Sequence, residues 1–140
     1  MRTSLLRTTG LVVACVWASD LVAGILKAAV DRPRPFERIA EADPLIHGII
    51  GNSFPSGHAA TSAAGVLVLS LVAPRAAPYF ALLAGAIAFS RIYVGVHYPL
   101  DVLAGALLGF AVAGAVLAAV RLLLPTSRGR RQPAVPPTPD

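Results

Sequence analysis

The sequence predicts an all-α protein, a transmembrane helical bundle of about four spans. Of its 140 residues, 56% are hydrophobic and only 14% are charged, whereas an average soluble domain carries about 25% charged residues. The apolar residues fall into four segments, and the two longest reach the roughly 20 residues that a helix needs to cross a bilayer. This composition excludes intrinsic disorder for most of the chain. The excess of apolar surface predicts that the protein is surrounded by lipid.

Each expected element follows from one apolar segment. The expected spans cover approximately residues 10–30, 58–73, 76–92 and 99–124, which together form a membrane domain over 10–124, with an external loop at 31–57. The second and third spans form a helical hairpin around Pro74, although each is short enough to be a buried core helix. Pro99 favours the start of the last helix, where a missing N–H costs nothing. Residues 125–140 are polar and rich in proline, so they form a disordered tail.

Small residues refine these expectations. The last segment carries Gly105 and Gly109 at the G-x3-G spacing, which suits close helix packing inside the bundle. The single cysteine, Cys15, excludes an intramolecular disulfide and a cysteine-rich metal site. Too few apolar residues precede Cys15 for the hydrophobic region of a signal peptide. The first segment is therefore expected to be a retained span.

The cations are distributed unevenly between the two ends of the expected bundle. Four spans place both termini on one side, which holds seven arginines and one acid, whereas the other side holds five cations and five acids. Cytoplasmic loops carry the excess of Lys and Arg. We therefore expect a multi-pass protein of the cell membrane in which residues 1–9 and 125–140 are cytoplasmic. The loop at 31–57 then faces the periplasm or the cell exterior.

Polar residues gather at one membrane face, at the ends of all four segments. Charged groups at membrane depth are costly and therefore indicate function. The bundle would bring into one layer the side chains of Lys27, Arg32, Arg34, Ser56, Gly57, His58, Arg91, His97 and Asp101. Several cations and two histidines around one carboxylate favour the binding of phosphate, because arginine makes bidentate contacts with its oxygens. Backbone N–H groups at a helix start bind the same anion.

The two histidines suggest separate roles. His97 lies just before the last helix, and Asp101 lies in its first turn. Asp101 can accept the N–H of one imidazole nitrogen, which leaves the other nitrogen free to attack phosphorus. His58 can protonate the leaving oxygen and then activate water, while the cations stabilise the developing charge. The carboxylate cluster of a two-metal phosphatase is missing, so we expect neither a metal nor another cofactor.

Three motifs carry a family resemblance. In order along the chain, they are Lys27 and Arg34-Pro35 at K-x6-R-P spacing, Pro55-Ser56-Gly57-His58, and Ser90-Arg91 followed by His97 and Asp101 after five and three further residues. Together they resemble the signature of the type-2 phosphatidic acid phosphatase superfamily, and of bacterial undecaprenyl-diphosphate phosphatases in particular. Membrane members usually have six spans. The chain starts at what resembles the third, so we expect a short version of that six-span core.

The resemblance implies a metal-independent phosphohydrolase that acts through a phosphohistidine. It implies His97 as the nucleophile, Asp101 as its orienting group and His58 as the acid. It also implies five phosphate ligands, namely Lys27, Arg34, Ser56, Gly57 and Arg91.

The expected function is hydrolysis of a lipid phosphate or diphosphate. Undecaprenyl diphosphate is favoured, with phosphatidic acid and phosphatidylglycerol phosphate as alternatives. The alternative function that is not enzymatic is a membrane subunit that binds anionic lipid. The other enzymatic alternative is a vanadate-dependent haloperoxidase, which uses the same set of residues. Nucleic acid is not an expected partner, because the chain has no basic polar face. A homo-oligomer or a partner that supplies helices remains open.

Three further polar residues lie outside the motifs. For Arg32, two roles are equally expected: a contact to substrate or an ion pair with Asp31. His47 stands alone in the loop and is expected to be exposed. Asp20 lies two turns before Lys27 on nearly the same helix face, where we expect a buried polar contact or a neutral acid rather than a catalytic group.

Overall fold

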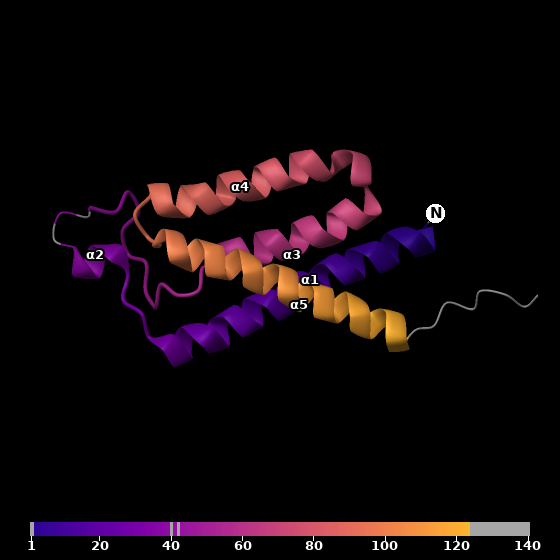
Figure 1. The fold of residues 1–140 in the computed structure, drawn as a ribbon, viewed down its shortest axis with the longest axis horizontal. Coiled ribbons are helices and arrows are strands. Elements are labelled where there is room, and N and C mark those ends of the chain that lie inside the picture. The colour runs from indigo at the N-terminus through magenta and orange to yellow at the C-terminus, as the bar shows by residue number, and fades with distance from the viewer. Residues whose placement is uncertain (1, 40, 42, 124–140) are drawn as a thin grey trace, which may run out of the picture.

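The computed structural model describes residues 2–39, 41 and 43–123, and every regular element in this part of the chain is helical (Figure 1). The long helices are α1 (Arg2–Val30), α3 (Gly57–Val72), α4 (Ala77–Tyr93) and α5 (Pro99–Leu123). A short helix, α2 (Pro35–Arg38), and a 3-10 turn, η1 (Pro74–Ala76), lie between them. The expected all-α fold class is confirmed. The expected tail at 125–140 lies outside the described residues.

Three segments are long and apolar enough to cross a membrane by length and composition, namely Leu5–Arg38, Pro74–Tyr93 and Pro99–Leu123. Helix α3 (Gly57–Val72) is apolar but shorter. The structure thus has three candidate spans and one shorter apolar helix where the sequence predicted about four spans. The turn η1 joins α3 to α4 as the helical hairpin that the sequence predicted.

The helix boundaries follow local signals. Helix α5 begins at Pro99, and α3 begins at Gly57 directly after its N-cap residue Ser56. Helix α1 starts earlier than expected and includes residues 2–9. That stretch contains apolar residues and lacks proline and glycine, so nothing in it interrupts the helix. The loop at 31–57 is likewise not wholly irregular, because it contains α2.

Helix α3 lies at the centre of the bundle, in contact with α1, α4 and α5 (Figure 1). Its buried residues are all small or medium-sized: Ala59, Ala60, Ala63, Ala64 and Val68. On α5, Gly105 packs against the backbone of Ser56 and Gly109 against that of Ala60. Small residues let helix backbones approach closely in a membrane bundle. The prediction that the two glycines serve packing inside the bundle is confirmed.

Large apolar side chains lie on the outside of the bundle. Trp17 on α1, Leu82 on α4 and Leu107 on α5 are examples, each more than half exposed. The buried core, by contrast, contains Ala, Val and one Cys among its hydrophobic residues in the described part of the chain. Apolar surface of this extent requires an apolar environment. The arrangement is that of a protein embedded in lipid.

One end of the bundle is closed by the loop between α1 and α3. The N–H of Ser53 donates to the Arg32 carbonyl at 2.8 Å, and the N–H of Ser56 donates to the Asp101 carbonyl at 2.9 Å. The N–H of Leu45 donates to the Val94 carbonyl at 3.2 Å. These bonds tie the loop to the start of α5 and to the α4–α5 turn. They bring the ends of α1, α3, α4 and α5 together at the same level.

Candidate active site

A cavity of about 360 Å³ lies at this closed end of the bundle. Six of the eight predicted site residues line it: Lys27, Arg34, Gly57, His58, Arg91 and His97. They come from α1, the loop after it, α3, α4 and the α4–α5 turn. The two remaining predicted residues, Ser56 and Asp101, are fully buried beside the cavity rather than in its lining.

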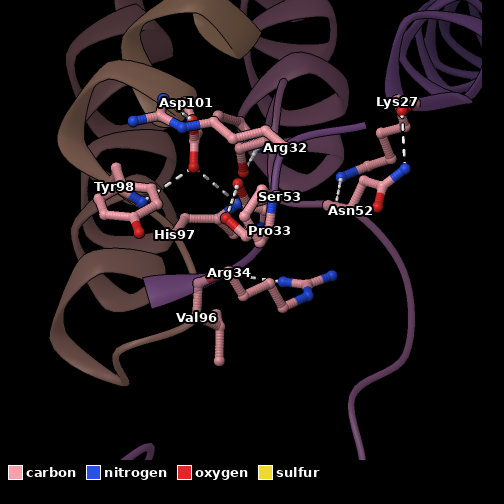
Figure 2. Close-up of polar contacts among 12 residues, drawn as sticks. Lys27, Arg32, Pro33, Arg34, Asn52, Ser53, Val96, His97, Tyr98 and Asp101 are labelled. Atoms are coloured by element: carbon pink, nitrogen blue, oxygen red, sulfur yellow. Dashed lines mark hydrogen bonds and ion pairs between the residues drawn. The ribbon is translucent and has the colours of Figure 1, made fainter. Parts of the chain in front are cut away.

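Backbone carbonyl groups hold the two cations from the first motif in place. Lys27 Nζ donates to the carbonyl oxygen of Asn52 at 2.9 Å, and the Asn52 side-chain amide donates back to the Lys27 carbonyl at 2.9 Å (Figure 2). Arg34 is only 6% exposed, and its Nε and Nη1 donate to the carbonyls of Gly51 and Val96 at 2.7 and 2.9 Å. These contacts leave part of each cation's hydrogen-bonding capacity for a ligand in the cavity.

The N-terminus of α3 forms one wall of the cavity. Ser56 is its N-cap residue, and its hydroxyl accepts the N–H of Ala59 at 3.4 Å. Gly57 and His58, the first two residues of the helix, line the cavity. A helix N-terminus is electropositive because its first N–H groups lack partners within the helix. The structure thus uses the hydroxyl of Ser56 to cap the helix, while the sequence predicted a ligand role for this residue.

The turn from α4 to α5 positions Arg91 and His97. The Arg91 carbonyl accepts the N–H groups of Val96 and His97, both at 3.3 Å. Gly95 has a φ of +76° in this turn, a conformation that glycine adopts without steric cost. The Arg91 guanidinium is oriented by its own neighbour, because Nε donates to the Ser90 hydroxyl at 3.2 Å. Arginine and histidine therefore reach the cavity from the two ends of one short turn.

Asp101 lies directly behind His97 and is 0% exposed. Its Oδ1 is 2.7 Å from Arg32 Nη1, and its Oδ2 accepts the Tyr98 N–H at 2.9 Å (Figure 2). His97 Nδ1 lies 3.7 Å from the same Oδ2, which is too long for a hydrogen bond. This buried nitrogen has no hydrogen-bond partner among the described residues. The expected carboxylate is thus next to the imidazole, and the expected hydrogen bond between them is not formed.

The environment of His97 favours its neutral form. Burial, followed by the positive charges of Lys27 and Arg34, lowers the pKa of His97 from 6.5 to about 4, and the Asp101 carboxylate opposes this shift. Uncharged at neutral pH, the imidazole can act as a nucleophile or as a base. The remaining positive charge in the cavity belongs to lysine and arginine side chains.

Several residues differ from their sequence-based interpretation. Arg32 pairs with Asp101 rather than with Asp31, so the ion pair considered for it is wrong; it does not line the cavity, and a contact to substrate stays a prediction. Asp20 is exposed and lines the cavity, so the expectation of a buried contact is wrong. Its carboxylate reaches the start of α3, where Oδ1 lies 3.6 Å from a Cβ built on Gly57. His47 is exposed, as predicted.

The sequence analysis also missed two residues of this region. Thr61 lines the cavity, and its hydroxyl donates to the Gly57 carbonyl at 3.0 Å. Its position one helical turn after Gly57 was a usable signal. Asn52 holds Lys27 from the middle of an irregular loop, where no periodicity could have identified it. Within residues 2–39, 41 and 43–123, no three His, Cys, Asp or Glu side chains are close enough to form a metal site.

The fold and the cavity together define an all-helical membrane protein with a cation-lined, histidine-bearing site suited to phosphate. The particular family is established by comparison with known proteins. The chain belongs to the PAP2 superfamily, whose family model matches residues 8–124.

Curated relatives in bacteria and archaea match most of the chain. Bacitracin transport permease protein BcrC of Bacillus licheniformis is 38% identical over 91 residues, which cover 65% of this chain and 45% of the relative. Undecaprenyl-diphosphatase of Sulfolobus acidocaldarius is 34% identical over 105 residues, which cover 74% of this chain and 51% of the relative. The chain thus spans about half the length of these curated relatives.

Two solved structures share the fold. Aquifex aeolicus LpxE superposes with a TM-score of 0.74 and 29% sequence identity, over 80% of this chain and 68% of LpxE. A PAP2-type phosphatidylglycerolphosphate phosphatase from Bacillus subtilis superposes with a TM-score of 0.62 and 28% identity, over 83% of this chain and 60% of that protein. The helical arrangement around the cavity is therefore that of transmembrane PAP2 phosphatases.

Proposed function

We propose that the protein is an integral-membrane lipid phosphatase or diphosphatase that works without a metal ion. The observation that carries this proposal is that one cavity is lined by five lysine, arginine and histidine side chains, namely Lys27, Arg34, Arg91, His58 and His97. These residues come from distant parts of the sequence and supply positive charge together with two imidazoles. A non-catalytic lipid-binding subunit would need the cations but would have no use for the neutral, buried His97.

In the proposed reaction, an unprotonated nitrogen of His97 attacks phosphorus. The bond from phosphorus to the leaving oxygen breaks, and His58 gives its proton to that oxygen as general acid. The product is a phosphohistidine at His97 and a free lipid alcohol or lipid phosphate. Neutral His58 then takes a proton from water, the resulting hydroxide attacks phosphorus, and the P–N bond breaks. Inorganic phosphate leaves, and both histidines return to their starting forms.

The cations serve the transition state of both steps. Charge develops on the three equatorial oxygens of the transferring phosphoryl group. Lys27 and Arg34 are held rigidly by carbonyl groups, and Arg91 is oriented by Ser90. Preorganised charge of this kind stabilises a transition state without reorganisation during the reaction. The N-terminus of α3 at Gly57 adds backbone N–H groups to the same site.

For the substrate we favour a polyprenyl diphosphate, with undecaprenyl diphosphate first. Support comes from the name of one matched relative, an undecaprenyl-diphosphatase. A relative from Bacillus subtilis is named phosphatidylglycerophosphatase B, and so phosphatidylglycerol phosphate, together with phosphatidic acid, is the alternative. The apolar outer surface of the bundle supports a substrate that is itself a lipid.

We further propose that the cavity opens on the outer face of the cell membrane, with the chain termini in the cytoplasm. The excess of arginine that the sequence assigns to the side of the chain termini supports this orientation. An outward-facing site would meet a lipid carrier after its cargo has been transferred, as carrier recycling in cell-wall synthesis requires.

Phosphate release from undecaprenyl diphosphate by the purified protein, in detergent with EDTA, tests the proposal. We expect wild-type turnover to resist EDTA and to fall at least about 1,000-fold in His97→Ala, which lacks the nucleophile. His47→Ala is the matched control, because His47 is exposed in the loop outside the cavity. Turnover that EDTA abolishes, or that survives in His97→Ala, would contradict the mechanism. Absence of turnover with all three lipids would favour the lipid-binding subunit.

A further inference from the structure

Arg32 is the cation of this region that the proposed mechanism does not use. It does not line the cavity, yet its Nη1 lies 2.7 Å from Oδ1 of the fully buried Asp101. Its guanidinium also lies over the ring of Tyr98, with Cζ 4.2 Å from the ring centroid (Figure 2). The arginine therefore contacts the carboxylate without lining the cavity, and its guanidinium stacks on an aromatic ring.

Both oxygens of the Asp101 carboxylate have a partner. A carboxyl group without exposure to water needs charged or hydrogen-bonding partners to compensate for its lost hydration. Oδ1 is paired with Arg32, and Oδ2 accepts the Tyr98 N–H. The other charged groups acting on Asp101 are Lys27 at the end of α1 and Arg34 in the loop, while His97 lies beside it. Arg32 alone among these cations forms an ion pair with Asp101 in the described structure.

The same contact determines which carboxylate oxygen faces the imidazole. With Oδ1 held by Arg32, Oδ2 is the oxygen near His97 Nδ1, at 3.7 Å. That nitrogen is buried and has no hydrogen-bond partner among the described residues. A small shift of the ring, of about 0.7 Å, would bring Nδ1 to hydrogen-bond distance of Oδ2. Hydrogen bonds in catalytic sites are often long before substrate binds and shorten in the reacting complex.

We infer that Arg32 is a positioning residue for His97 and acts through Asp101. By holding Oδ1, it directs Oδ2 at Nδ1 of His97. Nδ1 then carries the imidazole proton, and Nε2 is left with the lone pair that attacks phosphorus. The inference rests on the proposed phosphohistidine function, and it assigns to Arg32 a role that is distinct from phosphate binding.

Steady-state kinetics of Arg32→Ala and Arg32→Lys test this role. Because Arg32 lies outside the cavity, we expect Arg32→Ala to lower kcat by about 10–100-fold, as loss of outer-shell partners commonly does. The KM for lipid and the inhibition constant of inorganic phosphate should change less than about 3-fold. Arg32→Lys keeps the charge but loses the planar stack on Tyr98, so its kcat should lie between those of Arg32→Ala and wild type. Arg38→Ala, an exposed arginine of α2, is the matched control with unchanged kinetics.

Chemical rescue separates positioning from folding. The Arg32 side chain is 32% exposed, so guanidinium ions at millimolar concentration can enter the site vacated in Arg32→Ala. We expect them to restore kcat several-fold in Arg32→Ala and to have no such effect on Arg38→Ala. A rise in KM or in the phosphate inhibition constant with unchanged kcat would overturn the inference, because it would make Arg32 a substrate ligand. Unchanged kcat in Arg32→Ala would overturn it as well.

A measurement without turnover keeps the inference separate from the proposed function. The chain has three histidines, and nitrogen NMR of the 15N-histidine-labelled protein, with His97→Ala for assignment, reports which imidazole nitrogen carries the proton. We expect His97 to hold it on Nδ1 in wild type and Arg32→Lys, and to lose this preference in Arg32→Ala. An unchanged tautomer in Arg32→Ala would refute the role of Arg32. Failure of wild type to release phosphate from any lipid would refute the proposed function alone.

Discussion

Replacing Gly109 by alanine should force two core helices apart. A Cβ built on Gly109 of α5 would overlap the Ala60 carbonyl oxygen and lie 2.8 Å from the carbonyl carbon. Both atoms belong to the backbone of α3, so no side-chain rotation can relieve the overlap. Helices α3 and α5 would have to separate at this contact. The separation would also disturb the N-terminus of α3, which forms a wall of the cavity.

The size of the effect follows from two opposing contributions. Overpacking a core costs about 1–3 kcal/mol, and the rigid backbone neighbour places this substitution near the upper value. Alanine is a better helix former than glycine by roughly 0.5–1 kcal/mol, which offsets part of that cost. We expect the free energy of unfolding to fall by about 2 kcal/mol. The loss of stability follows from the close contact, because its cost exceeds the gain in helix propensity.

Gly114→Ala is the matched control on the same helix. A Cβ at Gly114 would meet nothing within 4 Å, so only the helix propensity changes and the free energy of unfolding should stay the same or rise by up to about 1 kcal/mol. Both variants can be unfolded by SDS titration in mixed micelles and followed by circular dichroism. If Gly109→Ala unfolds at the same SDS fraction as Gly114→Ala, the packing argument is wrong.

Three further predictions concern the site and its orientation. Lys27→Gln should raise the pKa of His97 above about 4, because a cation that disfavours imidazolium is removed; nitrogen NMR titration measures this, and an unchanged or lower pKa would contradict the electrostatic account. Gly105→Ala should lower kcat as well as stability, because the new Cβ overlaps the backbone of Ser56 at the start of α3; full activity would show that the site tolerates the shift. A cysteine replacing His47 should react with an impermeant thiol reagent on intact cells, with the buried native cysteine silent; labelling only after membrane disruption would reverse the proposed orientation.

The fold class and the helix order could be predicted from the sequence because they depend on local properties. The signals used were long apolar segments, a proline at the first position of a helix and a serine just before a helix. Each of these affects only the residues next to it in the chain. The start of α1 was missed because residues 2–9 are mostly polar yet contain no proline or glycine that would end the helix. The prediction there relied on hydropathy, whereas the helix depends on backbone propensity.

The candidate site was predictable in its composition but not in its bonding. The motifs identified the residues that meet at the cavity, and their types point to phosphate chemistry. They could not indicate that the Ser56 hydroxyl caps α3 or that Asp20 faces the cavity. These facts depend on the direction of a side chain relative to neighbouring helices, which spacing along one chain does not encode.

By itself, the sequence determined that this protein is a helical bundle in lipid with its motif cations and histidines at one end. Hydrophobicity and charge belong to each residue and do not depend on which tertiary contacts it makes. Only the tertiary structure decided the partner of each polar group. Arg32 and Asp101 are separated by 69 positions in the chain, and the sequence neighbour Asp31 was the wrong ion-pair partner for Arg32. A buried carboxylate takes whichever cation the fold brings within reach, and that distance is set by how α5 packs against the end of α1.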